Sequence, residues 1–382
     1  MTPFVPDVSE LRRWRRSAGR IARTRYPAFL FGREVPADEI PVFTYHDIDA
    51  DELDRDLEFL ERNGYRTLSL DEFCERMRAP SRHGRENCVL LTFDDARKSF
   101  FDAAYPVLKR RGARAALFVP TYWVGDRHVS PADATPPGFM TWAQIAECAA
   151  SGLVDVESHA YRHTLVFTSA RLAGFATPRA LRAYDLFDWP MRRERGVDLC
   201  GRPPLGTPIF ESAPLLSASH RYIEPALPAS TCRSLVEAGG GEGFFERRGA
   251  LAELKAAYAS VAGRVRGELV PASAFRTELE TELSLAVETF RRELGRKPRY
   301  FAYPWMLGNA ESLALLKDLG FEGAFGVALD FGRIRREASP LPVYGRYKRD
   351  YLKFLPGEGR RRLVGIVPEK LAGFLKDQHL AH

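Results

Sequence analysis

Short apolar runs alternate with helical repeats from Pro41 onward, and this alternation restricts the fold more than any other feature. A helical repeat is clearest at Leu53, Leu57 and Leu60, which lie between the first two apolar runs. Strands that alternate with helices indicate βα units and a parallel sheet. About seven parallel strands fit a distorted or incomplete (β/α) barrel better than an open sheet. The expected strands are residues 41–46, 65–70, 88–93, 114–120, 154–158, 299–304 and 321–327.

The segment 165–273 breaks this alternation, because it is rich in Pro, Gly and Ser and has few regular repeats. A structureless loop of that length is unusual in a compact domain, so we expect an insertion or lid with its own helices, near residues 230–240 and 248–269. The predicted organisation is a basic arm (1–40), two barrel parts (41–164 and 274–350) flanking the insertion, and a C-terminal tail (351–382).

Several classes of protein are disfavoured by composition. No run of eighteen apolar residues is present, so no transmembrane helix is expected. The N-terminus lacks the apolar core of a secretory signal, which predicts a cytoplasmic protein or a chain from which a signal has been removed. Five cysteines without C-x-x-C spacing argue against a disulfide framework and against a cysteine-built zinc site.

The net charge of +6 is partly local, because seven arginines and no acid lie between Arg12 and Arg25. Leu11, Trp14, Ala18 and Ile21 follow helical spacing there, which gives an apolar stripe beside a basic face. Such a helix could contact the inner face of an anionic membrane, or it could pack on the protein with its arginines solvated. No nucleic-acid partner is expected, since the remaining charges are mixed and no recognition motif is present.

Two adjacent carboxylates, Asp94 and Asp95, follow the apolar run 88–93. Neighbouring like charges repel and shift each other's pKa, so such a pair usually has a counter-charge or a function. The alternative is that one aspartate caps the next helix, expected to start near Arg97.

His159 and His163 are four residues apart, directly after the expected strand 154–158. On a helical turn this spacing would place both imidazoles on one side. Strand ends gather on one rim of a parallel barrel, so the histidines and the aspartates should meet there. Two histidines and one carboxylate form a catalytic metal site, which leaves the second carboxylate free to act as a base. This ligand set suits Zn²⁺, although other divalent ions fit it.

These motifs resemble those of the polysaccharide deacetylases, the NodB-homology group or carbohydrate esterase family four. "TFDDA" is similar to the first motif T-F-D-D-G, "SHAYRHT" to the second motif H-[S/T]-x-x-H, and "RYFAYPW" to the approach to the third. The resemblance covers residues 41–163 and about 275–347. It implies a metal-dependent hydrolase that removes an N-acetyl group from an amino sugar of a polysaccharide, a lipid-linked precursor or a glycoside.

The resemblance also implies residue roles: Asp94 as general base, and Asp95, His159 and His163 as metal ligands. Three positions depart from the family pattern, namely Ala96 in the first motif and Ala302 and Met306 in the third. The arginine that steadies the base in the family corresponds to Ala302, so we expect Arg346 to replace it.

The late histidine that acts as the acid in the family is not found, and His46, at the end of the first strand, is the candidate to replace it. A purely structural role for His46 is an equal alternative. Trp305, Tyr303 and Tyr161 could stack on a sugar ring, although packing is the default for aromatic residues at strand ends. Of the three, the sugar-binding role is favoured for Trp305.

Two alternative functions remain open at this point. The chain could be a deformylase or another amidase of the same fold, some of which lose metal ligands. It could also be a catalytically inactive glycan-binding scaffold, which the missing late histidine and the altered third motif favour.

Overall fold

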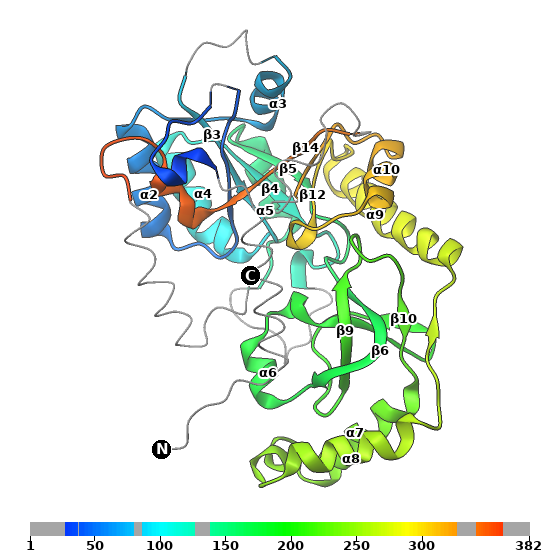
Figure 1. Cartoon of the computed structure of the whole chain (residues 1–382). Helices are drawn as coiled ribbons and strands as arrows, with labels where there is room; N and C mark the ends of the chain where they lie inside the picture. The colour runs from blue at the N-terminus through cyan, green and yellow to red at the C-terminus, as the bar shows by residue number, and fades with distance from the viewer. Residues whose placement is uncertain (1–26, 37, 80–85, 127–137, 327–340, 362–382) are drawn as a thin grey trace.

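The computed structural model describes residues 27–361, apart from residue 37 and the segments 80–85, 127–137 and 327–340. The basic helix expected between Leu11 and Ile21, and most of the expected tail, lie outside these residues. Figure 1 shows two bodies, a curled sheet with helices and, below it, a smaller sheet with a helical pair.

The larger body is a nine-stranded sheet in which every pairing is parallel. Its order is β14-β13-β12-β5-β4-β3-β1-β15, and β2 pairs with the start of β3. The seven expected strands are all present, but the expected count is too low because it omits the short strands β14 and β15. The strands are β1 (Val42–Tyr45), β2 (Arg66–Thr67), β3 (Cys88–Phe93), β4 (Ala115–Val119), β5 (Val154–Ser158), β12 (Tyr300–Ala302), β13 (Gly323–Phe325), β14 (Val343–Tyr344) and β15 (Tyr347–Lys348).

The sheet curls until its two edges almost meet. Strands β14 and β15 lie at opposite ends of the strand order, yet only Gly345 and Arg346 separate them in the chain. A link of that length spans at most about 11 Å. No pairing joins these two edges among the described residues, so the predicted incomplete barrel is confirmed, and Arg346 lies at its seam.

Helices cover the outside of the barrel. In α2, Asp49 caps the N-terminus by accepting a hydrogen bond from Glu52 N, and Leu53, Leu57 and Leu60 face the core, as their spacing predicts. Capping boxes start α3 and α5. The helices of this body are α2 (Ala50–Arg62), α3 (Leu70–Arg78), α4 (Tyr105–Arg111) after a π-helical turn (Phe100–Ala104), α5 (Trp142–Ala150), α9 (Ala272–Leu294) and α10 (Ala310–Asp318).

Alternate residues of each strand belong to different cores. Phe43, Leu91 and Leu117 join the large cluster that includes residues of α2, α4 and α5. Leu90 and Phe118 face the other way, into a smaller cluster. Because successive side chains of a strand alternate between faces, this pattern directs the residues that follow each strand to defined sides of the rim.

The smaller body is formed by the segment between β5 and α9. It contains a four-stranded sheet of order β8-β7-β6-β9, which the sequence pattern does not predict. The two predicted helices are present as α7 and α8, which pack side by side (Figure 1). The elements are β6 (Leu165–Phe175), α6 (Pro178–Ala183), a 3-10 turn η5 (Leu186–Asp188), β7 (Pro190–Glu194), β8 (Val197–Leu199), β9 (Pro208–Pro214), β10 (Tyr222–Ile223), α7 (Ala226–Ala238), α8 (Ala250–Ala262) and β11 (Glu268–Leu269).

Candidate metal centre and active site

The first motif forms a tight turn at the end of β3. Asp95 and Ala96 both have positive φ, 72° and 48°, a region that side chains with a Cβ rarely adopt. Neither aspartate caps the following helix among the described residues: Asp94 accepts from Arg346, and Oδ1 of Asp95 has no hydrogen-bond partner. The capping alternative is therefore wrong for this turn.

The two histidines lie in a loop after β5, not on a helical turn, so that expectation is wrong. The φ angles of Ala160 (69°) and His163 (48°) are positive, which rules out a regular helix. The loop nevertheless turns both side chains toward each other, with ring centroids 4.7 Å apart. The indole Nε1 of Trp123 donates to the carbonyl of Arg162 and fixes the middle of this loop.

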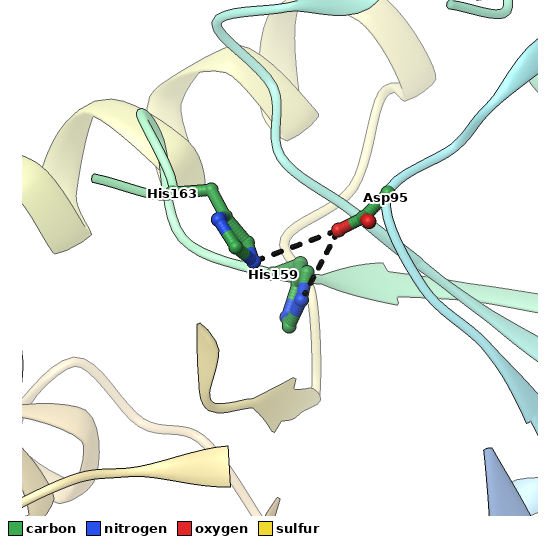
Figure 2. Close-up of side chains that lie close together, drawn as sticks. All are labelled: Asp95, His159 and His163. Atoms are coloured by element: carbon green, nitrogen blue, oxygen red, sulfur yellow. Dashed lines mark ion pairs between the residues drawn. The ribbon is translucent and has the colours of Figure 1, made fainter. Parts of the chain in front are cut away.

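Asp95, His159 and His163 converge on one point, as Figure 2 shows. Oδ1 of Asp95 lies 3.6 Å from Nε2 of His159 and 3.5 Å from Nε2 of His163. Ligand atoms around a tetrahedral zinc ion, each about 2.1 Å from it, lie roughly 3.4 Å apart. The three side chains are buried, and their spacing suits a single divalent ion.

The protonation of this cluster also suits a cation. Nδ1 of His159 donates to the carbonyl of Ala302 at 2.8 Å, which leaves the lone pair on Nε2, facing Asp95. Burial lowers the pKa of His159, and this effect outweighs the negative charges of Asp94 and Asp95, which raise it. Burial also holds the pKa of His163 well below its ordinary value. Both imidazoles are therefore neutral near pH 7. The unpartnered Oδ1 of Asp95, buried between them, completes a donor set that a divalent ion would satisfy.

Asp94 lies beside this cluster on the inner side of the barrel. Nη1 of Arg346 donates to its Oδ1 at 2.7 Å, so the cation expected to replace the family arginine contacts the expected base. Its Oδ2 lies 3.7 Å from Nε2 of His159 and 3.9 Å from Nε2 of His46. Burial raises the pKa of Asp94, but Arg346, His159 and His46 together outweigh it, so the net pKa is below the ordinary value.

His46 follows β1 and is the most open of these groups, with 41% of its side chain exposed. It therefore lies on the solvent side of Asp94, where a substrate could reach it. The three histidines and two aspartates picked out from the sequence all lie at the ends of β1, β3 and β5.

The three aromatic candidates differ in placement. Trp305 has positive φ (51°), and its ring packs on His163 at 4.3 Å between centroids, so one face is occupied by a metal-site residue. Tyr161 is half-buried and contacts Tyr122 edge-on. Tyr303 is buried in the core beside Phe301, where it presents no face to a sugar. The structure thus leaves Trp305 and Tyr161 near the rim and Tyr303 beneath it.

Two further residues support the site and were missed from the sequence. Glu282 of α9 is buried, and its carboxylate accepts from the backbone N–H and the guanidinium of Arg162. An acid on the apolar stripe formed by Leu279, Leu283 and Ala286 was a detectable sign of such a role. Phe187 of η5 packs on His163 at 4.2 Å between centroids, and nothing local in the sequence predicts that contact.

Comparison with known proteins gives one consistent result. Residues 81–177 match the polysaccharide deacetylase family. The Bacillus subtilis protein YxkH, whose name assigns it to the polysaccharide deacetylases, is 32% identical over 138 residues, which are 34% of this chain and 45% of that protein. The poly-β-1,6-N-acetyl-D-glucosamine N-deacetylase of Escherichia coli K12 is 32% identical over 114 residues, 27% of this chain and 16% of that protein.

A solved structure extends the similarity to most of the fold. A de-N-acetylase from Aggregatibacter actinomycetemcomitans aligns with a TM-score of 0.50 and 16% identity, covering 86% of this chain and 98% of that chain. The chain thus spans less than half of either curated relative, and the structural likeness concerns the fold alone. The resemblance predicted from the motifs is confirmed, and so is the barrel fold.

Proposed function

We propose that the chain is a metal-dependent hydrolase that removes an N-acetyl group from an amino sugar, because residues 81–177 match the polysaccharide deacetylase family. The observation that carries this proposal is the convergence of Asp95, His159 and His163 beside an Asp94 that is paired with Arg346. An ion site next to a carboxylate that is held ionised is the arrangement that metal-assisted hydrolysis of an amide by water uses.

Asp95, His159 and His163 would hold the ion, which we propose to be Zn²⁺. When bound, such an ion polarises the amide carbonyl and lowers the pKa of water. Asp94 is the proposed general base. Its Oδ1 is engaged by Arg346, so its Oδ2 is the atom available to take a proton from the attacking water.

The leaving amine must receive a proton, and His46 is the proposed donor. Its Nε2 lies 3.9 Å from Oδ2 of Asp94, so both groups could reach the attacking water and the leaving nitrogen of one amide. Its exposure supports contact with substrate rather than a purely structural role. Arg346 is the proposed positioning residue for the base, in place of the family arginine.

The proposed substrate is an N-acetylated glucosamine glycan, by analogy with the substrate named for the Escherichia coli relative. We propose that the segment 165–273, between the barrel parts 41–164 and 274–350, forms one wall of the sugar pocket. Trp305 and Tyr161 are the proposed stacking residues. The half-buried state of both residues supports this role, whereas the burial of Tyr303 gives it no support.

Contact with the inner face of a membrane through the arm 1–40 stays a prediction from the sequence alone. Within the described ranges, no helix combines the length and apolar character needed to cross a bilayer. Loss of binding to anionic vesicles on deletion of residues 1–26 would support the arm's role, and unchanged binding would refute it.

Metal analysis and acetate release test the proposal together. Purified protein should contain about one zinc ion per chain and release acetate from a β-1,6-linked N-acetylglucosamine oligosaccharide. Asp94→Asn should keep the metal and lose acetate release, while Asp102→Asn, an exposed acid shortly after the first motif, should retain both. Full activity of Asp94→Asn would refute the base assignment.

The same experiment separates the alternatives. Formate release from an N-formyl analogue without acetate release would identify a deformylase. Oligosaccharide binding without release of either acid would identify a glycan-binding scaffold. The intact set of three ligand side chains favours the deacetylase over both.

A further inference from the structure

Arg97, directly after the first motif, is held in an aromatic setting that its position in the sequence does not predict. Its guanidinium carbon lies over the rings of Phe139 and Phe187, 4.8 and 4.7 Å from their centroids, and only 14% of its side chain is exposed. Cation–π contacts of a partly desolvated arginine are favourable, so two of them restrict its position.

The donors of Arg97 point to two acids that belong to different bodies. Nη2 donates to Oδ1 of Asp185 at 2.6 Å, and Nε lies 3.9 Å from Oδ2 of Asp95. The two oxygens of the Asp95 carboxylate therefore have different neighbours: Oδ2 lies near Arg97, and Oδ1 faces His159 and His163. Oδ1 is therefore the oxygen of Asp95 that faces the candidate ion site, and Arg97 lies beside the other oxygen.

Asp185 is itself rigidly placed. Its Oδ1 also accepts from the backbone N–H of Phe187, and its own N–H donates to Asp188, which closes a capping box on η5. The same short turn therefore holds Arg97 through Asp185 and packs Phe187 on His163. This turn of the smaller body therefore contacts two of the three candidate ligands: Asp95 through Arg97, and His163 through Phe187.

The turn that carries Asp95 needs such support. Asp95 and Ala96 both have positive φ, a region that is unfavourable for a non-glycine residue. Backbone hydrogen bonds from Met140 N to Ala96 O and from Lys98 N to Gly138 O brace the turn on one side. Arg97, which pairs with Phe139 in the same stretch, braces the Asp95 side chain on the other.

We propose that Arg97 is a positioning residue for Asp95 and that Asp185 and Phe187 hold it in place, so that the inserted segment forms part of the metal-binding framework. This inference rests on the proposed function, because it assumes that Asp95, His159 and His163 bind an ion. It assigns the inserted segment a role in metal affinity, in addition to any contact with sugar.

Zinc affinity of the full chain tests the proposal without reference to activity. Metal-stripped protein would compete with a chromophoric chelator for Zn²⁺, at a temperature where circular dichroism shows each variant folded. Arg97→Gln should weaken binding by about 10-fold or more, the usual effect of losing a partner of a metal ligand. Asp185→Asn should weaken it by about 3-fold or more, because Arg97 remains but is no longer anchored.

A double variant and a matched control make the test specific. Arg97→Gln combined with Asp185→Asn should bind zinc about as tightly as Arg97→Gln alone, because the two residues act through one contact. Glu242→Gln removes an exposed ion pair with Arg182, three residues from Asp185, and should leave affinity unchanged.

Each other outcome is decisive. If Arg97→Gln binds zinc as tightly as the wild type, this inference is overturned and the proposed function stands. If Arg97→Gln does not fold, wild-type zinc affinity in Asp185→Asn has the same consequence. Effects of the two single variants that simply add would overturn the shared contact. A wild-type protein that binds no zinc would overturn the proposed function together with the inference.

Discussion

Arg346, at the seam of the barrel, forms a buried ion pair with Asp94, at the end of β3. Nη1 of Arg346 donates to Oδ1 of Asp94 at 2.7 Å, the two residues are 252 positions apart, and their side chains are 1% and 2% exposed. Arg346 can reach Asp94 because the link between β14 and β15 crosses from one sheet edge to the other. Closure of the fold and ionisation of the proposed base therefore depend on the same residue.

Arg346→Met should destabilise the protein and inactivate it. Removing one partner of a buried ion pair leaves an uncompensated charge, which typically costs about 3–5 kcal/mol. Urea denaturation of the wild type and the variant measures this loss, and acetate release should fall together with it. Arg276→Met, which breaks only exposed ion pairs with Glu280 and Glu311, should change the free energy of unfolding by less than about 1 kcal/mol. Equal stability of the two variants would contradict the argument.

Glu282 should be needed for the histidine loop. Its buried carboxylate satisfies the backbone N–H and the guanidinium of Arg162, between two residues with positive φ, Ala160 and His163. Glu282→Ala should lower the free energy of unfolding by about 3 kcal/mol and weaken zinc binding, because the loop loses its acceptor. Glu282→Gln keeps one acceptor oxygen and should be milder. Denaturant unfolding and chelator competition measure both effects.

The control for this prediction lies on the same helix. Glu288 is exposed on α9, so Glu288→Ala should change stability by no more than about 0.5 kcal/mol. If Glu282→Ala and Glu288→Ala behaved alike, the support of the loop would have to come from elsewhere.

The acid stability of the smaller body should depend on Asp198. Arg221, itself 1% exposed, and Arg193 each donate two hydrogen bonds to this carboxylate. Burial raises the pKa of Asp198, but the two arginines outweigh it and hold the pKa well below its ordinary value. A carboxyl group with a lowered folded-state pKa contributes stability above its unfolded pKa, about 3.9, and loses it as the pH falls through the folded value.

Asp198→Asn should therefore lower the free energy of unfolding by roughly 2 kcal/mol at pH 7, since hydrogen bonds to charged groups are lost. The difference between wild type and variant should shrink as the pH falls below about 4. Urea denaturation at pH 7, 5 and 3 measures it. Glu253→Gln, in an exposed pair with Arg247, supplies a baseline without this pH dependence. A difference independent of pH would mean that packing, not charge, explains the loss.

The barrel and its candidate metal ligands were predictable because their determinants are local. Apolar runs of five or six residues mark β3 and β4, and β5 shows the alternation VDVES. In a parallel sheet the ends of these strands must share one rim, which brings Asp95, His159 and His163 together. The loop conformation of the histidine pair was not predictable, since tertiary contacts hold Ala160 and His163 at positive φ.

Other features depend on contacts between distant segments. The four-stranded sheet of the smaller body contains prolines at the ends of its strands and register shifts in β6, which obscure a period of two. The setting of Arg97 depends on Phe139 and Phe187, which lie 42 and 90 residues further along the chain. No local sequence pattern predicts these contacts of Arg97. The pairing of Arg346 with Asp94 was predictable because the family motif has an arginine where this chain has Ala302, so another cation was expected beside the base.

His46 should act on the leaving group, and the choice of substrate can isolate that step. If it protonates the departing amine, His46→Gln should lower kcat for N-acetylglucosamine oligosaccharides by about 10²–10⁴-fold while zinc content stays unchanged. An aryl acetate ester needs no proton on its leaving phenolate, so its hydrolysis should be nearly unaffected. His220→Gln, a histidine of the smaller body that bonds to the carbonyl of Thr168, should leave both reactions unchanged. Equal losses on amide and ester would instead indicate that His46 supports Asp94, which lies 3.9 Å away, because the base is needed for both substrates.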